Sequence, residues 1–284
     1  MNADMQISQF NRIEQLLEWN RHKEAIKEAE EYIHLYHDDP DGYAILGKIY
    51  LEKDEYAKAL HWSQEGLRMD PENKLSWEVR VSTFYEKEDW KACKKALNEA
   101  LALYPYESFF YFLNGNLYMR TKKFEEAKES FERALDIRPD NGVYLANYSY
   151  ALALLGNEEA SLEIEKQALV EEPENAYVFM YLAWSADQRG DFDKAHQFLA
   201  NAVRLDPENA QIRREYLEIL QKQYKIYRIF LAPSRLLSKM KPWQALILWF
   251  GAWIVFKPLI LIFIILYVAA HWGTKLLVNW KVFS

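Results

Sequence analysis

The chain has 284 residues, of which 50% are hydrophobic and 27% are charged. This balance is typical of a folded protein and excludes an intrinsically disordered one. Only 9 glycines and 9 prolines are present, which disfavours a fold of many short strands joined by tight turns. The one cysteine, Cys93, excludes an internal disulfide bond and fits a reducing compartment.

Charge is distributed unevenly along the chain. Residues 210–284 contain 11 lysines and arginines and 2 acids, whereas residues 1–209 contain 24 basic and 40 acidic residues. We therefore expect an acidic soluble body followed by a basic, apolar region. The acidic body disfavours nucleic acid as a partner. The first residues, MNADMQISQF, have neither the basic start nor the apolar core of a secretory signal.

Five prolines recur at intervals of 34 residues, which indicates an internal repeat. They are Pro71, Pro105, Pro139, Pro173 and Pro207. The period divides the chain into six windows: 6–39, 40–73, 74–107, 108–141, 142–175 and 176–209. One column of the aligned windows contains only small residues, namely Ala25, Ala59, Cys93, Ala127, Ser161 and Ala195. Small side chains at one position predict a close crossing of two helices.

Each window is expected to form two helices. In the window 108–141, Phe124, Ala127, Phe131 and Ala134 follow helical spacing in the second half. The proline at the end of a window cannot continue this second helix. An asparagine follows two residues after Pro71, Pro139, Pro173 and Pro207, and asparagine caps the free N–H groups of a new helix.

The repeat resembles the tetratricopeptide repeat, in which an aromatic residue, Leu-Gly, Tyr, Ala, Phe, Ala and Pro occupy set positions. The second window matches at Tyr43, Leu46, Gly47, Tyr50, Ala59 and Pro71. The fourth matches at Tyr111, Gly115, Tyr118, Ala127, Phe131, Ala134 and Pro139, with Asn114 in place of leucine. The resemblance covers residues 1–209 and implies an all-α, right-handed superhelical solenoid of about six helical hairpins.

The segment 210–235 is expected to supply a capping helix, 210–231, and then a basic juxtamembrane linker. The 33 residues from Pro242 to Thr274 contain one charge, Lys257. We expect residues 236–284 to form a membrane-anchoring hairpin of two short helices that turns near Lys257-Pro258. One alternative is an interfacial helix, 236–256, followed by a single span, 258–277. Another is a hairpin buried in a soluble protein.

Basic residues flank the apolar run without any acid among them, and they include Arg228, Arg235, Lys239 and Lys241. The positive-inside rule then predicts a membrane protein, multi-pass or tail-anchored, with the repeats in the cytoplasm and residues 236–280 in the lipid bilayer. The words YRIFL and WFGAWIVFKPL are similar to the tails of an uncharacterised bacterial group of tetratricopeptide proteins with a C-terminal membrane anchor.

No catalytic motif is recognisable, so we expect neither an enzyme nor a cofactor. His34 and His37 lie three residues apart before two acids, but no further metal ligand accompanies them, and we expect a solvated helix end. Cys93 lies in the small-residue column, where packing explains it better than nucleophilic chemistry.

The first helix of each hairpin lines the concave surface in tetratricopeptide repeats, so the resemblance places a peptide-binding site there. The residues expected to bind are Phe109, Phe112, Asn116, Asn147, Tyr150, Tyr177, Tyr181 and Trp184. Asn116 and Asn147 match two asparagine places of the family's carboxylate clamp, whereas Phe112, Tyr177 and Tyr181 replace its lysines and arginine. The sequence therefore predicts a membrane-anchored scaffold that binds a partner peptide or protein. The alternative is a structural or assembly subunit of a membrane complex that contacts its partners through the transmembrane tail.

Overall fold

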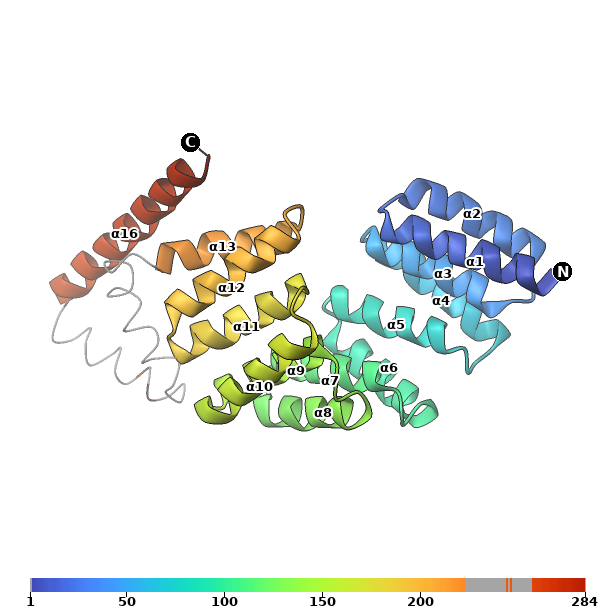
Figure 1. Ribbon diagram of the computed structural model, residues 1–284, viewed down its shortest axis with the longest axis horizontal. Helices are drawn as coiled ribbons and strands as arrows, with labels where there is room; N and C mark the ends of the chain where they lie inside the picture. Colours follow the sequence, from blue (N-terminus) through green and yellow to red (C-terminus); the bar gives the residue numbers. More distant parts are fainter. Residues whose placement is uncertain (1, 223–243, 245, 247–256, 284) are drawn as a thin grey trace. The chain divides into compact units, whose positions relative to one another are not determined.

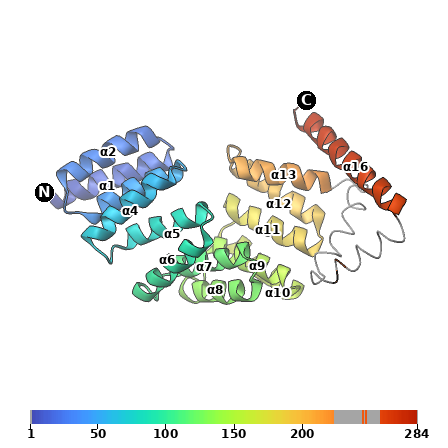
Figure 2. The same cartoon turned by 180° about the vertical axis from the view of Figure 1, so that it is seen from behind.

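In a computed structural model, the described residues are 2–222, 244, 246 and 257–283. They form fourteen helices and no strand. The prediction of an all-α protein is therefore confirmed for this part of the chain. The chain divides into two compact units, Met1–Pro139 and Asp140–Ser284, and Figures 1 and 2 show the helices of each from opposite sides.

The first unit consists of helical hairpins in which each helix packs against the next one along the chain. The first helices of successive hairpins also contact one another, because α1 touches α3, α3 touches α5 and α5 touches α7. The helices are α1 (Asn2–Glu18), α2 (His22–Leu35), α3 (Pro40–Glu52), α4 (Tyr56–Met69), α5 (Lys74–Glu86), α6 (Trp90–Leu103), α7 (Ser108–Arg120) and α8 (Phe124–Ile137).

The second unit continues the pattern of alternating first and second helices. Its helices are α9 (Gly142–Leu154), α10 (Glu158–Glu171), α11 (Ala176–Arg189), α12 (Phe192–Leu205), α13 (Ala210–Lys222) and α16 (Lys257–Phe283). Here α9 contacts α11, α12 contacts α13, and α13 contacts α16. The capping helix expected over 210–231 is described as far as Lys222, and the rest of it lies outside the described residues.

Asparagine residues cap the N-termini of four first helices, α5, α9, α11 and α13, as the recurring Pro-x-Asn segments predict. The side-chain oxygen of Asn73 accepts a hydrogen bond from Ser76 N at 2.8 Å, and that of Asn141 accepts one from Tyr144 N at 2.9 Å. Asn175 and Asn209 cap α11 and α13 in the same way. Each cap satisfies an N–H group that has no partner within its own helix, so the predicted capping role is confirmed at all four positions.

The turn inside each hairpin places one residue in the left-handed backbone region, again every 34 residues. In the first unit these residues are Asn20, Asp54, Glu88 and Lys122, with φ between 55° and 59°. In the second unit they are Gly156 and Gly190, with φ of 79° and 87°. Glycine adopts this conformation without a steric penalty, and asparagine and aspartate tolerate it. The strained turns of the first unit are therefore those at Glu88 and Lys122, and the second unit avoids such strain with glycine.

The small-residue column lies where the helices of a hairpin cross. Each of its six members is fully buried, at 0% exposure. Next to this crossing, a side chain on Gly115 would lie 2.5 Å from the ring of Phe131. Burial raises the pKa of the Cys93 thiol to about 12, so this cysteine remains protonated near neutral pH. Its packing role is therefore confirmed.

Candidate functional site

The eight residues expected to bind a partner belong to both units, and each group is described by itself. Phe109, Phe112 and Asn116 lie on α7 of the first unit. Asn147 and Tyr150 lie on α9, and Tyr177, Tyr181 and Trp184 lie on α11, all in the second unit.

The α7 residues are partly buried by neighbouring rings. The ring centroid of Phe109 lies 5.7 Å from that of Phe110, and Phe109 packs against the apolar core of the first unit. The centroid of Phe112 lies 6.0 Å from that of Phe131. Asn116 is partly exposed. These phenylalanines therefore contribute to packing as well as to the surface.

In the second unit, three aromatic side chains from α9 and α11 lie together. The centroid of Trp184 lies 5.8 Å from that of Tyr150 and 5.2 Å from that of Tyr181, the latter pair being T-shaped. The Trp184 indole Nε1 donates a hydrogen bond of 2.9 Å to Oε2 of Glu215 on α13. We call Tyr150, Tyr181, Trp184 and Glu215 the aromatic cluster. All four are partly exposed, so the cluster presents rings and a carboxylate to solvent.

Glu215 was not identified from the sequence. Burial raises the pKa of its carboxyl group, and the hydrogen bond from Trp184 partly opposes this effect. The signal that could have found it is the interval of 31 residues from Trp184, which connects the first helices of neighbouring hairpins.

Tyr177 and Asn147 occupy different environments. Tyr177 is 45% exposed, and its hydroxyl accepts a hydrogen bond from Asn209 Nδ2 at 3.2 Å. Asn147 is 1% exposed, and its Nδ2 donates to the carbonyl oxygen of Val143 at 2.9 Å, one turn earlier in α9. Asn147 was expected to hold a partner's main chain, but in this structure its amide binds the backbone of its own helix.

A buried polar network lies between α9, α10 and α11. Arg189 donates to the hydroxyls of Ser161 at 2.6 Å and Ser185 at 2.7 Å, and it forms an ion pair with Glu165. Ser149 joins the two other serines at 3.1 and 2.9 Å. The side chains of Glu165 and Arg189 are only 1% and 5% exposed. This network fixes the helices that hold Tyr150 and Trp184.

The expected membrane-anchor flank, Arg228, Arg235, Lys239 and Lys241, lies outside the described residues. The helix α16 begins at Lys257, where the apolar run was divided, and its side chains are described over 262–277. Among the described residues, no helix is both long enough and apolar enough to cross a membrane. The described residues likewise contain no group of three or more side chains suited to a metal ion.

Family models of the tetratricopeptide repeat match residues 40–73, 108–141 and 161–210. The first two ranges coincide with the second and fourth windows of the 34-residue period. The chain therefore contains tetratricopeptide repeats, as the spacing of Tyr, Gly, Ala and Pro indicated.

Two curated proteins are similar over parts of the chain. Anaphase-promoting complex subunit 3 of Schizosaccharomyces pombe is 23% identical over 161 residues, which are 56% of this chain and 24% of that protein. Small glutamine-rich tetratricopeptide repeat-containing protein 2 of Mycosarcoma maydis is 24% identical over 100 residues, 35% of this chain and 28% of that protein. The chain thus spans about a quarter of the length of these relatives.

Solved structures show the same fold. A chain of the anaphase-promoting complex hetero-tetramer Cut9–Hcn1 superimposes with a TM-score of 0.63 at 14% identity, over 76% of this chain and 43% of that chain. The pilF protein of Pseudomonas aeruginosa superimposes with a TM-score of 0.59 at 19% identity, over 78% of this chain and 99% of that chain. At these identities the likeness establishes a helical repeat fold and no specific activity.

Proposed function

We propose that this tetratricopeptide-repeat chain is a non-enzymatic scaffold that binds a peptide or protein segment on the aromatic cluster of its second unit. The observation that carries the proposal is the gathering of Tyr150, Tyr181 and Trp184, partly exposed, on the first helices of two successive hairpins. Large rings with few rotatable bonds supply contact area at a low cost in side-chain entropy, which makes them good anchors.

The chemistry of the cluster favours a segment that is partly apolar. Glu215 fixes the indole of Trp184 through the hydrogen bond of 2.9 Å and offers its carboxylate to N–H groups of a bound chain. Tyr177 extends the surface, because it lies four residues before Tyr181 and therefore on the same side of α11. Two of the similar proteins are named as parts of a multi-protein complex, which supports a role in assembly.

Site-specific photocrosslinking tests this proposal. Tyr177, 45% exposed, is replaced by a benzoylphenylalanine in the full chain, and exposed Val170 on α10 provides a matched position away from the cluster. We expect a discrete crosslinked partner from position 177 and none of that product from position 170. The product should disappear when Tyr150→Ala is added. Identical products from both positions would show that the cluster does not select the partner.

The proposal includes attachment of the C-terminal region to a lipid bilayer, with the repeats in the cytoplasm. Five successive side chains of α16, from Ile262 to Leu266, are apolar and 39% to 59% exposed. Successive residues point in different directions around a helix, so this apolar surface is not confined to one packed face. The alternative occupant of this surface is a membrane helix of a larger complex, in which the chain would be a structural subunit.

Flotation with phosphatidylcholine vesicles tests the attachment. We expect the full chain to float and the variant Ile264→Asp with Ile265→Asp to remain at the bottom, while Ile7→Asp, at a 60% exposed position of α1, floats like the native chain. A native chain that stays at the bottom would refute attachment by lipid alone. Flotation only together with a membrane protein would favour the alternative.

A further inference from the structure

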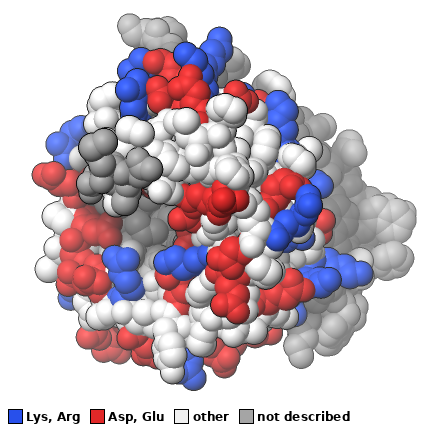
Figure 3. Space-filling model, turned by 90° about the vertical axis from the view of Figure 1, so that its right-hand side faces the viewer, with Lys and Arg blue, Asp and Glu red and all other residues white. Residues whose placement is uncertain are grey.

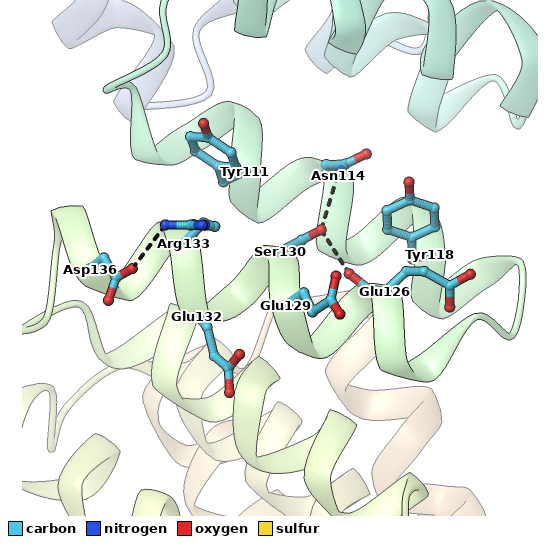
Figure 4. Close-up of a pocket in the computed structure, with 9 residues that line it drawn as sticks. All are labelled: Tyr111, Asn114, Tyr118, Glu126, Glu129, Ser130, Glu132, Arg133 and Asp136. Atoms are coloured by element: carbon cyan, nitrogen blue, oxygen red, sulfur yellow. Dashed lines mark hydrogen bonds and ion pairs between the residues drawn. The ribbon is translucent and has the colours of Figure 1, made fainter.

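We propose that the protein has a second binding site, which lies in the first unit. It is a cavity between α7 and α8 that receives an arginine side chain from a basic segment of a partner protein. The cavity has a volume of about 580 Å³. In Figure 4 the residues from α7 lie on one side and those from α8 on the other, with Asn114 and Ser130 joined between them. This site is separate from the aromatic cluster, and the proposal does not depend on it.

The cavity lies where the fourth window has a small side chain in a column that is large and apolar in three other windows. In the second window, the ring of Trp62 lies 6.2 Å from the ring of Tyr43. Two periods later the equivalent residues are Ser130 and Tyr111, so a hydroxymethyl group stands where an indole fills the space. The same column holds Ile164 and Phe198 in the fifth and sixth windows, and Glu28 and Ala96 in the first and third. The loss of this volume leaves room beside α7.

The floor of the cavity is polar. Asn114 Nδ2 donates to Ser130 Oγ at 3.0 Å, and Ser130 Oγ donates to the carbonyl oxygen of Glu126 at 2.8 Å. Asn114 replaces the leucine found in the second and sixth windows at Leu46 and Leu182. Both members of a pair that is apolar in the second and sixth windows are therefore polar here, and they face a cavity rather than a ring.

The molecule itself shows that these walls accept a cation. Lys94 of α6 donates from Nζ to Asn114 Oδ1 at 2.9 Å and to the Tyr118 hydroxyl at 2.6 Å. Its ammonium lies 4.4 Å from the centroid of the Tyr118 ring, a cation–π distance. Tyr111, one helical turn before Asn114, presents a second ring to the cavity.

Carboxylates dominate the rim. Four acids and one arginine line the cavity. Asp136 lies 3.8 Å from Arg133, and Glu132 lies 3.6 Å from Lys128. Among the described residues, no ion pair engages Glu126 or Glu129, and both are exposed. The acids that line the cavity attract a positively charged segment. Figure 3 shows acidic and basic side chains interspersed on another face of the molecule.

Arginine is the side chain that fits these walls. Its planar guanidinium pairs with a carboxylate through two parallel hydrogen bonds and also stacks on an aromatic ring. A cavity of this size admits the whole side chain and part of its backbone. Phosphate-bearing ligands are disfavoured by the carboxylates at the rim.

Fluorescence anisotropy with a defined probe tests the site on the full chain. The probe is a fluorescein-labelled peptide with two arginines separated by glycine and serine, and its matched forms have lysine or uncharged citrulline instead. We expect the arginine form to bind about tenfold more tightly than the citrulline form. This is the change in affinity expected when the citrulline form lacks one charge-assisted hydrogen bond that the arginine form makes. Equal binding of these two forms would overturn the proposal.

Two variants separate the cavity from general electrostatic attraction. Asn114→Leu with Ser130→Ile introduces an apolar pair like that of the second and sixth windows without a change in net charge, and we expect it to lose about tenfold in affinity. Glu126→Gln with Glu129→Gln should weaken binding more than Glu158→Gln with Glu159→Gln, an equal charge change at exposed positions of α10. Native affinity in the filled variant, or equal losses in the two charge pairs, would show that no cavity site exists.

Discussion

The hairpins α7–α8 and α9–α10 are consecutive in the sequence, lie in different units, and fill the same core position with opposite chemistry. In the first, Phe131 is fully buried beside Gly115, which has no side chain to obstruct the ring. Thirty-four residues later the equivalent residue is Glu165, also buried, and Ser149 stands in place of the glycine. Glu165 forms ion pairs with Arg189 and Lys194, in contrast to the packed ring of Phe131.

This difference shows what the repeat requires of its core. The backbone of the hairpin is preserved whether a ring packs on glycine or an ion pair is surrounded by hydroxyl groups, because both fill the volume and leave no polar group without a partner. The two solutions differ in their response to mutation. When a side chain in an apolar core is shortened, the core loses contacts in proportion to the volume removed. When a buried ion pair loses one partner, the charge of the other is left without compensation.

The largest effect is expected from breaking the ionic core. Arg189→Met should lower the free energy of unfolding of the second unit by up to about 3–5 kcal/mol, since Glu165 would remain buried with Lys194 as its remaining ion-pair partner. Hydrogen exchange resolved by peptide measures this in the full chain, and α9 to α11 should lose protection while α3 and α4 keep theirs.

The matched control replaces both charges at once. Glu165→Leu with Arg189→Met gives the second unit the leucine that Leu97 and Leu199 supply at the same column of other repeats. We expect most of the lost stability to return, because an apolar pair needs no desolvation of charge. If the double variant is as unstable as Arg189→Met alone, the ion pair stabilises the second unit more than the apolar pair that replaces it.

The apolar core should be most sensitive to added volume. Gly115→Ala places a Cβ atom 2.5 Å from Cε1 of Phe131, so the ring must move, and we expect a loss of about 1–3 kcal/mol in the first unit. Ser149→Ala at the equivalent position of the second unit removes a hydroxyl and should cost about 1 kcal/mol. Urea unfolding of both variants measures the difference, and a larger loss from Ser149→Ala would reverse the comparison.

The regular features of the fold could be predicted from the sequence, because each depends on residues close together. The proline spacing, the small-residue column and the asparagine caps are local and recur every 34 residues, so they determine the hairpins. The pairing of Glu165 with Arg189 joins different hairpins and does not follow the repeat. Trp184 and Glu215 also join different hairpins, and only their interval of 31 residues hints at the contact. The family's pattern suggested a binding role for Asn147, but its side chain is buried and its amide donates a hydrogen bond to the carbonyl oxygen of Val143.

A smaller effect is expected from the turns, where the two units also differ. Gly190 has φ of 87° and no atom within 4 Å of an added Cβ, so Gly190→Ala should cost about 1 kcal/mol through backbone strain alone. Lys122, with φ of 59°, is the counterpart in the first unit, and Lys122→Gly should raise stability by up to about 1 kcal/mol. Thermal unfolding in which both substitutions have the same sign would contradict this account.

The smallest effect concerns the carboxyl group of the aromatic cluster and its dependence on pH. Burial raises the pKa of Glu215 above the value of about 4.3 for an unfolded chain. Between these two pKa values the folded protein retains a proton that the unfolded chain has lost, so the contribution of Glu215 to stability is complete below about pH 4 and decreases as the pH rises through the folded pKa. Glu215→Gln has no charge and still accepts the hydrogen bond from Trp184. The variant should therefore gain stability relative to the native chain as the pH rises, by less than about 1 kcal/mol because solvent screens a partly exposed group.

Glu78 on α5 gives the matched test in the first unit, since burial raises its pKa also and Lys74 partly opposes this. Urea unfolding of each variant from pH 4 to pH 8 measures the change, and a difference that stays constant or falls with pH would show that the burial of these carboxyl groups does not control their titration.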